Sequence, residues 1–206
     1  MDRQEIINDY VTDMAAVEKH ILEAVERQIG TPATKDFPEA LAVLNDVRTT
    51  LARHVSALEG FNEDTRGGGL KETLKEAVTG TLGVAAGIYN KIRQEDQVSR
   101  MVRDTYTALG LATISYNMMY TTALGLKEDR LAQIALDHLK DLSPLVVDLS
   151  KTVCLVVAHE LSQEDKLIDP AIGQEAVRRT HEAWSSQNVG SGDGGTVRTS
   201  AAATAP

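Results

Sequence analysis

Apolar residues recur at alternating spacings of three and four along four long segments, and this period restricts the fold more than any other feature. The segments are expected at about 2–29, 36–61, 96–124 and 127–159. The spacing is that of one face of an α-helix, whereas a half-buried strand alternates every second residue. Aromatic residues are only 4% of the chain, so small aliphatic side chains must fill its interior. We therefore expect an all-α protein in which helices pack on helices.

Glycine and proline mark the ends of these segments. Gly30 and Pro32 end the first segment, Pro38 lies in the first turn of the second, and Gly125 ends the third. These are the positions that each residue type favours at helix ends. The first connection is short, so the first two helices should lie antiparallel. Pro144 falls inside the fourth segment and is expected to bend that helix, because it removes a backbone hydrogen bond.

The rest of the chain divides into a bundle and additions to it. We expect residues 1–160 to form an antiparallel four-helix bundle. Within it, 62–69 should be a loop and 70–93 a helical insertion between the second and third long helices. A short C-terminal helix is predicted within 161–184. Residues 185–206 are rich in Gly, Ser, Thr and Ala, and are expected to be disordered.

Charge and cysteine content exclude several function classes. The net charge of -9 argues against nucleic-acid binding, which needs clustered Lys and Arg. One cysteine, Cys154, allows neither an intrachain disulfide nor a zinc site built from cysteines. The acidic N-terminus has no signal-peptide pattern. The uncharged stretch 105–126 is interrupted by Asn, Gly, Tyr and Thr, so we expect a buried core helix there and a cytoplasmic protein.

Glu18 and His54 are the first candidates for a functional site. Each lies on the apolar stripe of its helix, where a lone carboxylate would be costly to bury. Two interpretations stay open: structural hydrogen bonding, or metal binding. One glutamate and one histidine facing inward from adjacent helices are half of a carboxylate-bridged metal site. Their spacing from the helix connection differs by about one turn, so sharing one ion needs a favourable stagger.

His138 and Asp141 on the fourth helix complete the candidate set. With Asp148 they form a polar strip that is typical of a solvated face, unless the bend at Pro144 turns the first two inward. The third helix is empty, since no carboxylate or histidine occurs between Asp104 and Glu128. No Glu-x-x-His motif occurs on the second or fourth helix, so a complete di-iron centre is not expected.

Several of these residues carry a resemblance to the ferritin-like superfamily, and within it to bacterial stress-associated proteins of the YciE/YciF type. The similar parts, within about 3–157, are 13–19 on the first helix, His54, Ser115-Tyr116 and 122–125. The resemblance implies that Glu18 and His54 are metal ligands for iron or manganese. Proteins of that family have further glutamates early in the third helix, at positions that correspond to residues near Leu109 and Ala112 here. They also have a pair of glutamates in the fourth helix, and the nearest match to that pair in this chain is Asp141.

Three functions are therefore open. The first is a non-catalytic stress-associated or accessory protein, expected as a homodimer, with a degenerate metal site and no catalytic residue. The second is an oxidoreductase or metal store that holds iron or manganese through Glu18, His54 and either Asp141 or His138. The third is an interaction module that uses 70–93 to bind a partner helix or a membrane surface, although that segment is not strongly basic.

Overall fold

The computed structural model describes residues 2–66, 97–166, 169 and 171–186, and every regular element among them is helical. The elements are α1 (Arg3–Gly30), the 3-10 helix η1 (Pro32–Asp36), α2 (Pro38–Arg66), α5 (Val98–Gly125), α6 (Asp129–Gln163) and α7 (Ile172–Ser186). The all-α prediction is confirmed for this part of the chain. The predicted insertion at 70–93 lies outside the described residues, as does the predicted tail from residue 187 onward.

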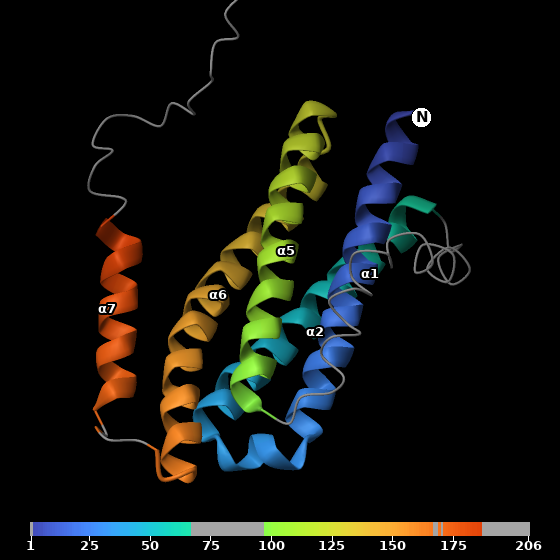
Figure 1. Cartoon of the computed structure of the whole chain (residues 1–206). Helices are drawn as coiled ribbons and strands as arrows, with labels where there is room; N and C mark the ends of the chain where they lie inside the picture. The colour runs from blue at the N-terminus through green and yellow to red at the C-terminus, as the bar shows by residue number, and fades with distance from the viewer. Residues whose placement is uncertain (1, 67–96, 167–168, 170, 187–206) are drawn as a thin grey trace, which may run out of the picture.

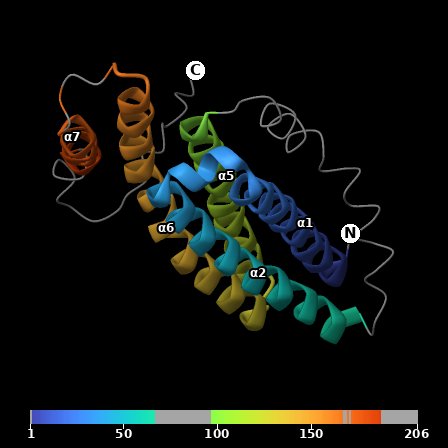
Figure 2. The same ribbon diagram turned by 90° about the horizontal axis from the view of Figure 1, so that it is seen from below.

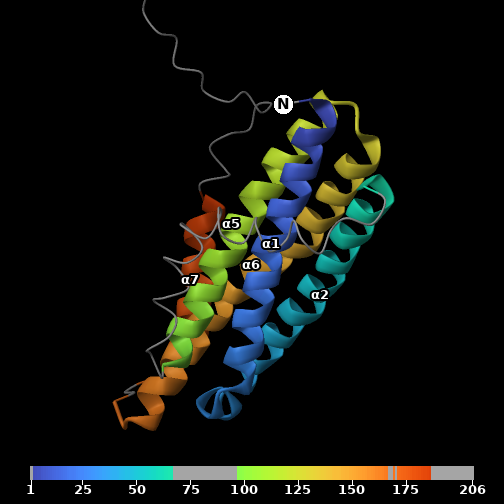
Figure 3. The ribbon, with the colours of Figure 1, turned by 90° about the vertical axis from the view of Figure 1, so that its right-hand side faces the viewer.

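The long helices pack in antiparallel pairs. α1 packs against α2 and α5, and α6 packs against the other side of the same two helices. Figures 1 and 3 show that α1 and α6 run one way while α2 and α5 run the other. The last turn of α2 and the first turn of α5 therefore lie at opposite ends of the molecule. The antiparallel packing of α1 and α2 agrees with their short connection.

The helix ends follow from local sequence, with one correction. Asp2 caps α1: its carboxylate accepts from the Glu5 backbone N–H at 2.8 Å, and the Glu5 carboxylate accepts from the Asp2 N–H at 3.1 Å. Pro38 begins α2 as predicted. The prediction of a loop from residue 62 is wrong for 62–66, because α2 continues to Arg66. The side chains of Phe61 and Asn62 are buried there, and tertiary packing prevails over the weak helix propensity of asparagine.

The core between the long helices is mostly aliphatic. Its buried residues recur along one stripe of each helix, and the largest fully buried side chain is Tyr116 on α5. Leu109 and Ala112, where the family resemblance places glutamates, are fully buried and apolar. The uncharged stretch 105–126 thus belongs to a core helix. Charged or titratable groups also enter this interior, at Glu18, His54 and His138.

α7 lies outside the four long helices, beside α6 (Figures 1 and 2). It spans Ile172–Ser186 and so overlaps most of the helix predicted within 161–184, although 161–163 belong to α6. Just before it, the Asp169 carboxylate accepts a hydrogen bond from the Ala171 N–H at 2.9 Å. At its first turn α7 comes very close to α6, because a Cβ added to Gly173 would lie 3.0 Å from the Ala158 Cβ. Glycine is therefore required for the observed approach of the two helices.

α6 contains a long apolar stretch. It is continuous from Asp129 to Gln163, with Pro144 inside it. By length and composition alone it is also the one helix in the described residues that is apolar enough to cross a membrane. Its most apolar 18-residue window has a mean hydropathy of 1.4, yet only 22% of that window is buried. Much of the apolar surface of α6 is therefore not covered by its neighbours.

Candidate metal centre

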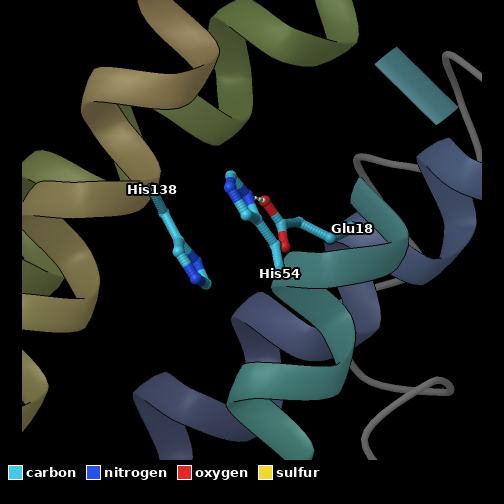
Figure 4. Close-up of side chains that lie close together, drawn as sticks. All are labelled: Glu18, His54 and His138. Carbon is cyan, nitrogen blue, oxygen red and sulfur yellow. Dashed lines mark hydrogen bonds and ion pairs between the residues drawn. The ribbon is translucent and has the colours of Figure 1, made fainter. Parts of the chain in front are cut away.

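Three titratable side chains from three helices meet in the interior. Glu18 comes from α1, His54 from α2 and His138 from α6, and Figure 4 shows them pointing toward one another. Glu18 and His54 are 0% exposed and His138 is 5% exposed. One potential ligand atom of each residue lies within 4.8 Å of those of the other two. The three side chains thus form one compact cluster enclosed by apolar packing.

His54 is held at both of its ring nitrogens. Its Nδ1 lies 3.1 Å from Glu18 Oε1, and its Nε2 lies 3.2 Å from Asp141 Oδ2. The same Asp141 oxygen accepts a hydrogen bond from Arg53 Nη2 at 2.8 Å. The side chain of Asp141 is 41% exposed, so this row of contacts runs from the buried glutamate to the surface.

His138 lies flat against His54 and is held by Tyr116. The two imidazole rings are stacked, with centroids 3.7 Å apart and planes inclined by 2°. The Tyr116 hydroxyl lies 2.7 Å from His138 Nδ1. Burial, and then the charge of His54, lower the pKa of His138 to about 3, while burial and the charge of Glu18 raise that of Tyr116 above its ordinary value. At neutral pH the tyrosine is therefore the donor and the neutral imidazole the acceptor.

Glu18 has an incompletely satisfied carboxylate. Burial raises its pKa, and this effect is opposed by His54 and by the nearby Tyr116 hydroxyl. Its Oε2 atom is buried and, among the described residues, has no hydrogen-bond partner. Buried acceptors without a partner are rare and call for an explanation. A proton or a bound cation would satisfy this oxygen.

The contacts of His54 fix the number of protons in the cluster. Each of its nitrogens faces a carboxylate oxygen, so a hydrogen bond at each side requires a proton at each side. The two protons are shared by an imidazolium between two carboxylates, or by a neutral imidazole and one protonated carboxyl group. Where Asp141 is ionised, Arg53 offsets its charge at the surface end.

The donor set fits a first-row divalent metal ion. Two imidazoles and one carboxylate suit iron, manganese and zinc. His54 has a feature typical of metal-bound histidines, because its other nitrogen contacts a carboxylate, here Asp141. The ring orientations are one restriction. An ion must lie near the plane of each imidazole that binds it, and the stacked planes of His54 and His138 are parallel. Binding by both requires one ring to turn.

The structure brings all four predicted ligand residues together. The stagger between α1 and α2 places Glu18 beside His54, although the two residues differ by about one helical turn in their distance from the connection between these helices. Asp141 reaches the cluster through His54 Nε2 rather than from inside it. Asp148 does not join them: it is exposed and pairs with Lys151.

His138 corrects the prediction of a solvated strip on the fourth helix. It is buried because it lies on the apolar stripe of α6, in the series Leu131, Ala135, His138, Leu142, Leu145 and Leu149. The spacings of four and three in this series identify His138 without any bend at Pro144.

Two residues of the site were not predicted as such. Tyr116 was predicted to be a core residue of the third helix, which is confirmed, but its hydroxyl also fixes His138. Arg53 precedes His54 and pairs with Asp141. The position of Tyr116 on the apolar stripe was a usable signal, because a buried tyrosine hydroxyl needs a polar partner. No sequence pattern pointed to Arg53, whose partner is distant in the chain.

Comparisons of this chain with protein-family models, with curated proteins and with solved structures give no match. Function must therefore be inferred from the chemistry of the cluster and from the packing around it.

Proposed function

We propose that this chain is a ferritin-like four-helix-bundle protein that binds a single divalent transition-metal ion, iron or manganese, between α1, α2 and α6. Glu18, His54 and His138 are the proposed ligands, and Asp141 supports His54 from outside. The observation that carries the proposal is the buried Glu18 carboxylate, which has one oxygen without a hydrogen-bond partner and two histidines beside it.

The directions of the helices support the ferritin-like part of the proposal. Such bundles have one long crossover connection, which joins two helices that run the same way. α2 and α5 run the same way, and residues 67–97 separate the end of α2 from the start of α5 in the sequence. The resemblance of 13–19 and His54 to stress-associated ferritin-like proteins points in the same direction and suggests an accessory role under stress.

The composition of α5 supports one ion rather than two. A bundle di-iron centre takes carboxylates from all four helices. α5 offers the Tyr116 hydroxyl, while Leu109 and Ala112 fill the corresponding interior with apolar atoms. The protein is therefore proposed to bind or buffer an ion, not to run the chemistry of a di-iron oxidase.

The residues of the cluster define what binding involves. Without metal, the contact between His54 Nδ1 and Glu18 Oε1 holds a proton. An ion that takes these two atoms displaces that proton, so binding should release about one proton per ion. Asp141 accepts the proton that stays on Nε2, which orients the ring and makes it a better ligand. Tyr116 holds His138 beside the site until that ring turns.

The test is metal analysis with matched variants. Purified protein is loaded with iron(II), manganese(II) or zinc, freed of excess metal, and analysed for bound metal and for its melting temperature. We expect about one ion per chain and a higher melting temperature in its presence. Glu18→Gln should abolish both effects, and Asp141→Asn should weaken affinity about 10- to 100-fold.

The control is Glu23→Gln, which removes a carboxylate from the exposed face of the same helix. It should bind metal as the wild type does. Equal binding by wild type and Glu18→Gln, or none by either, would contradict the proposal. The cluster would then be a structural hydrogen-bond network.

A further inference from the structure

A hollow region lies where α7 meets α6 and α5, further along α6 than the metal centre. It has two adjoining parts of about 260 Å³ each, and both are lined by Val153 and Cys154. Together they fall in the range of about 300 to 1,000 Å³ that is usual for small-molecule sites. Along α6 the lining runs from Leu149 to Leu161, which is about 18 Å of helix axis at about 1.5 Å per residue. The site is therefore a long groove.

The two parts of the groove differ in chemistry. The part near the start of α7 is lined only by apolar side chains and glycine: Val153, Cys154, Val157, Ala158, Leu161, Ile172, Gly173 and Ala176. The part near the end of α7 adds Arg103 and Lys151, the rings of Tyr106 and Trp184, and the imidazole of His181. The charged side chains that line it are both cationic.

Large apolar side chains are left exposed along the groove. Val157, Leu161, Ile172 and Trp184 all line it, and their exposed fractions are between 38% and 50%. Exposed apolar residues that gather around a hollow mark a binding site more often than scattered ones do.

We propose that this groove binds a long-chain fatty acid, with the acyl chain along Val153, Val157 and Leu161 and the carboxylate between Arg103 and Lys151. The arrangement matches an amphipathic anion: an extended apolar channel with cationic groups at one end only. A flat aromatic anion would fill the part beside Trp184 and leave the purely apolar part empty. A fatty acid uses both parts.

Arg103 and Lys151 already take part in ion pairs, which a ligand carboxylate would have to compete with. Arg103 contacts Asp104 at 2.7 Å, and Lys151 contacts Asp148 at 3.3 Å. Lys151 and Arg103 are 41% and 53% exposed, and pairs of this kind are weak because water screens them. A carboxylate brought in by a buried acyl chain can compete for both cations. This proposal is independent of metal binding, because it shares no residue with the cluster.

The only tryptophan in the sequence provides the signal for the test. Trp184 lines the cationic part of the groove and is half exposed, so a ligand that displaces water there should shift its emission to shorter wavelength. Full-length protein is titrated with palmitate below its aggregation concentration, and with hexadecanol as an uncharged analogue. We expect saturable binding of palmitate with one molecule per chain by native mass spectrometry, and weaker binding of hexadecanol.

Exposed charges are replaced to test the carboxylate position without disturbing the core. The double variant Arg103→Gln/Lys151→Gln should weaken palmitate binding about tenfold and change hexadecanol binding less than twofold. Lys140→Gln is the matched control, because Lys140 is also on α6 and pairs with an aspartate three residues away. It should bind both compounds as the wild type does.

A blocking variant tests the channel itself. Cys154 lines both parts, so Cys154→Phe should abolish palmitate binding while the variant still melts cooperatively. The proposal is overturned if palmitate leaves Trp184 emission unchanged, or if the double variant binds palmitate as tightly as the wild type. It is also overturned if the protein binds anionic phospholipid vesicles but not free palmitate, which would make the groove a membrane contact.

Discussion

The two halves of α6 depart from ordinary packing in opposite directions. The first half carries His138 on a stripe enclosed by the other long helices, so titratable groups lie inside an apolar core. The second half, from Leu149 to Leu161, carries apolar side chains that α7 covers incompletely. One helix thus has polar groups where water is absent and apolar groups where water is present.

The two halves of α6 indicate where a function can be sought from packing alone. Burying a carboxylate costs free energy, and so does leaving a long apolar strip in water. Folding alone favours neither, since an aliphatic side chain at 18 or 54 would pack as well as its neighbours. Binding sites are expected where a sequence departs from the rules of burial that the rest of it follows. The metal centre and the groove are two such places.

The largest expected effect comes from removing one partner inside the cluster. His54→Ala leaves the Glu18 carboxylate buried without its main partner, and should lower the free energy of unfolding by about 3 to 5 kcal/mol. Urea denaturation in the presence of a chelator measures the change. The double variant Glu18→Met/His54→Leu removes both charges and fills the space, so it should be as stable as the wild type or more stable. A double variant as unstable as His54→Ala would show that the cluster is needed for folding.

A second pair of variants compares the two halves of α6 directly. Leu142→Ala, in the enclosed half, should cost about 2 to 5 kcal/mol because it leaves a cavity in the core. Leu161→Ala, in the groove half, should cost less than about 1 kcal/mol because that side chain is already 38% exposed. Both values come from urea denaturation. Similar costs at the two positions would mean that the groove is closed in solution.

The pH dependence of stability tests the enclosed half again, with a smaller expected effect. The pKa of His138 falls from 6.5 when unfolded to about 3 when folded, so between these values the unfolded chain binds the extra proton. Its contribution to stability is therefore complete above pH 6.5 and is lost as the pH falls toward 3, by at most about 1.4 kcal/mol per pH unit.

Glu18 acts in the opposite sense. Its pKa is raised on folding. The stability that it contributes is therefore complete below pH 4.5, the pKa of the unfolded state, and is lost as the pH rises through the folded pKa. Metal-free His138→Gln should therefore show a flatter, or reversed, dependence between pH 7 and 4.5, and glutamine can still accept from Tyr116. Parallel curves for the variant and the wild type would contradict the assignment of a neutral buried histidine.

The sequence predicted the helices better than the site. The spacing of apolar residues located all four long helices to within a few residues, except at the end of α2. That period depends only on which face of each helix is buried. It also identified Glu18 and His54, because a polar residue on an apolar stripe is visible in one helix alone.

The parts of the site that depend on tertiary packing were not predictable in the same way. His138 was assigned to a solvated face because Leu139 and His138 compete for the same stripe position, and only the positions of Leu142 and Leu145 decide between them. The contact of His54 with Asp141 depends on how α2 lies against α6. The groove arises because α7 covers only part of the apolar side of α6, and no pattern within α7 reveals this.

The smallest expected effect is at the surface end of the cluster. Arg53 is 64% exposed, and its ion pair with Asp141 should contribute less than about 1 kcal/mol, so Arg53→Gln should change the urea midpoint only slightly. The same small loss is expected for Arg130→Gln, which removes an exposed pair with Asp64 outside the cluster. Added salt should remove the difference between Arg53→Gln and the wild type, because it screens an exposed pair. A loss above about 2 kcal/mol that persists in high salt is outside the range of surface pairs. Such a loss would mean that the pair of Arg53 and Asp141 is shielded from water as Glu18 and His54 are, and that the polar cluster extends to the surface of the protein.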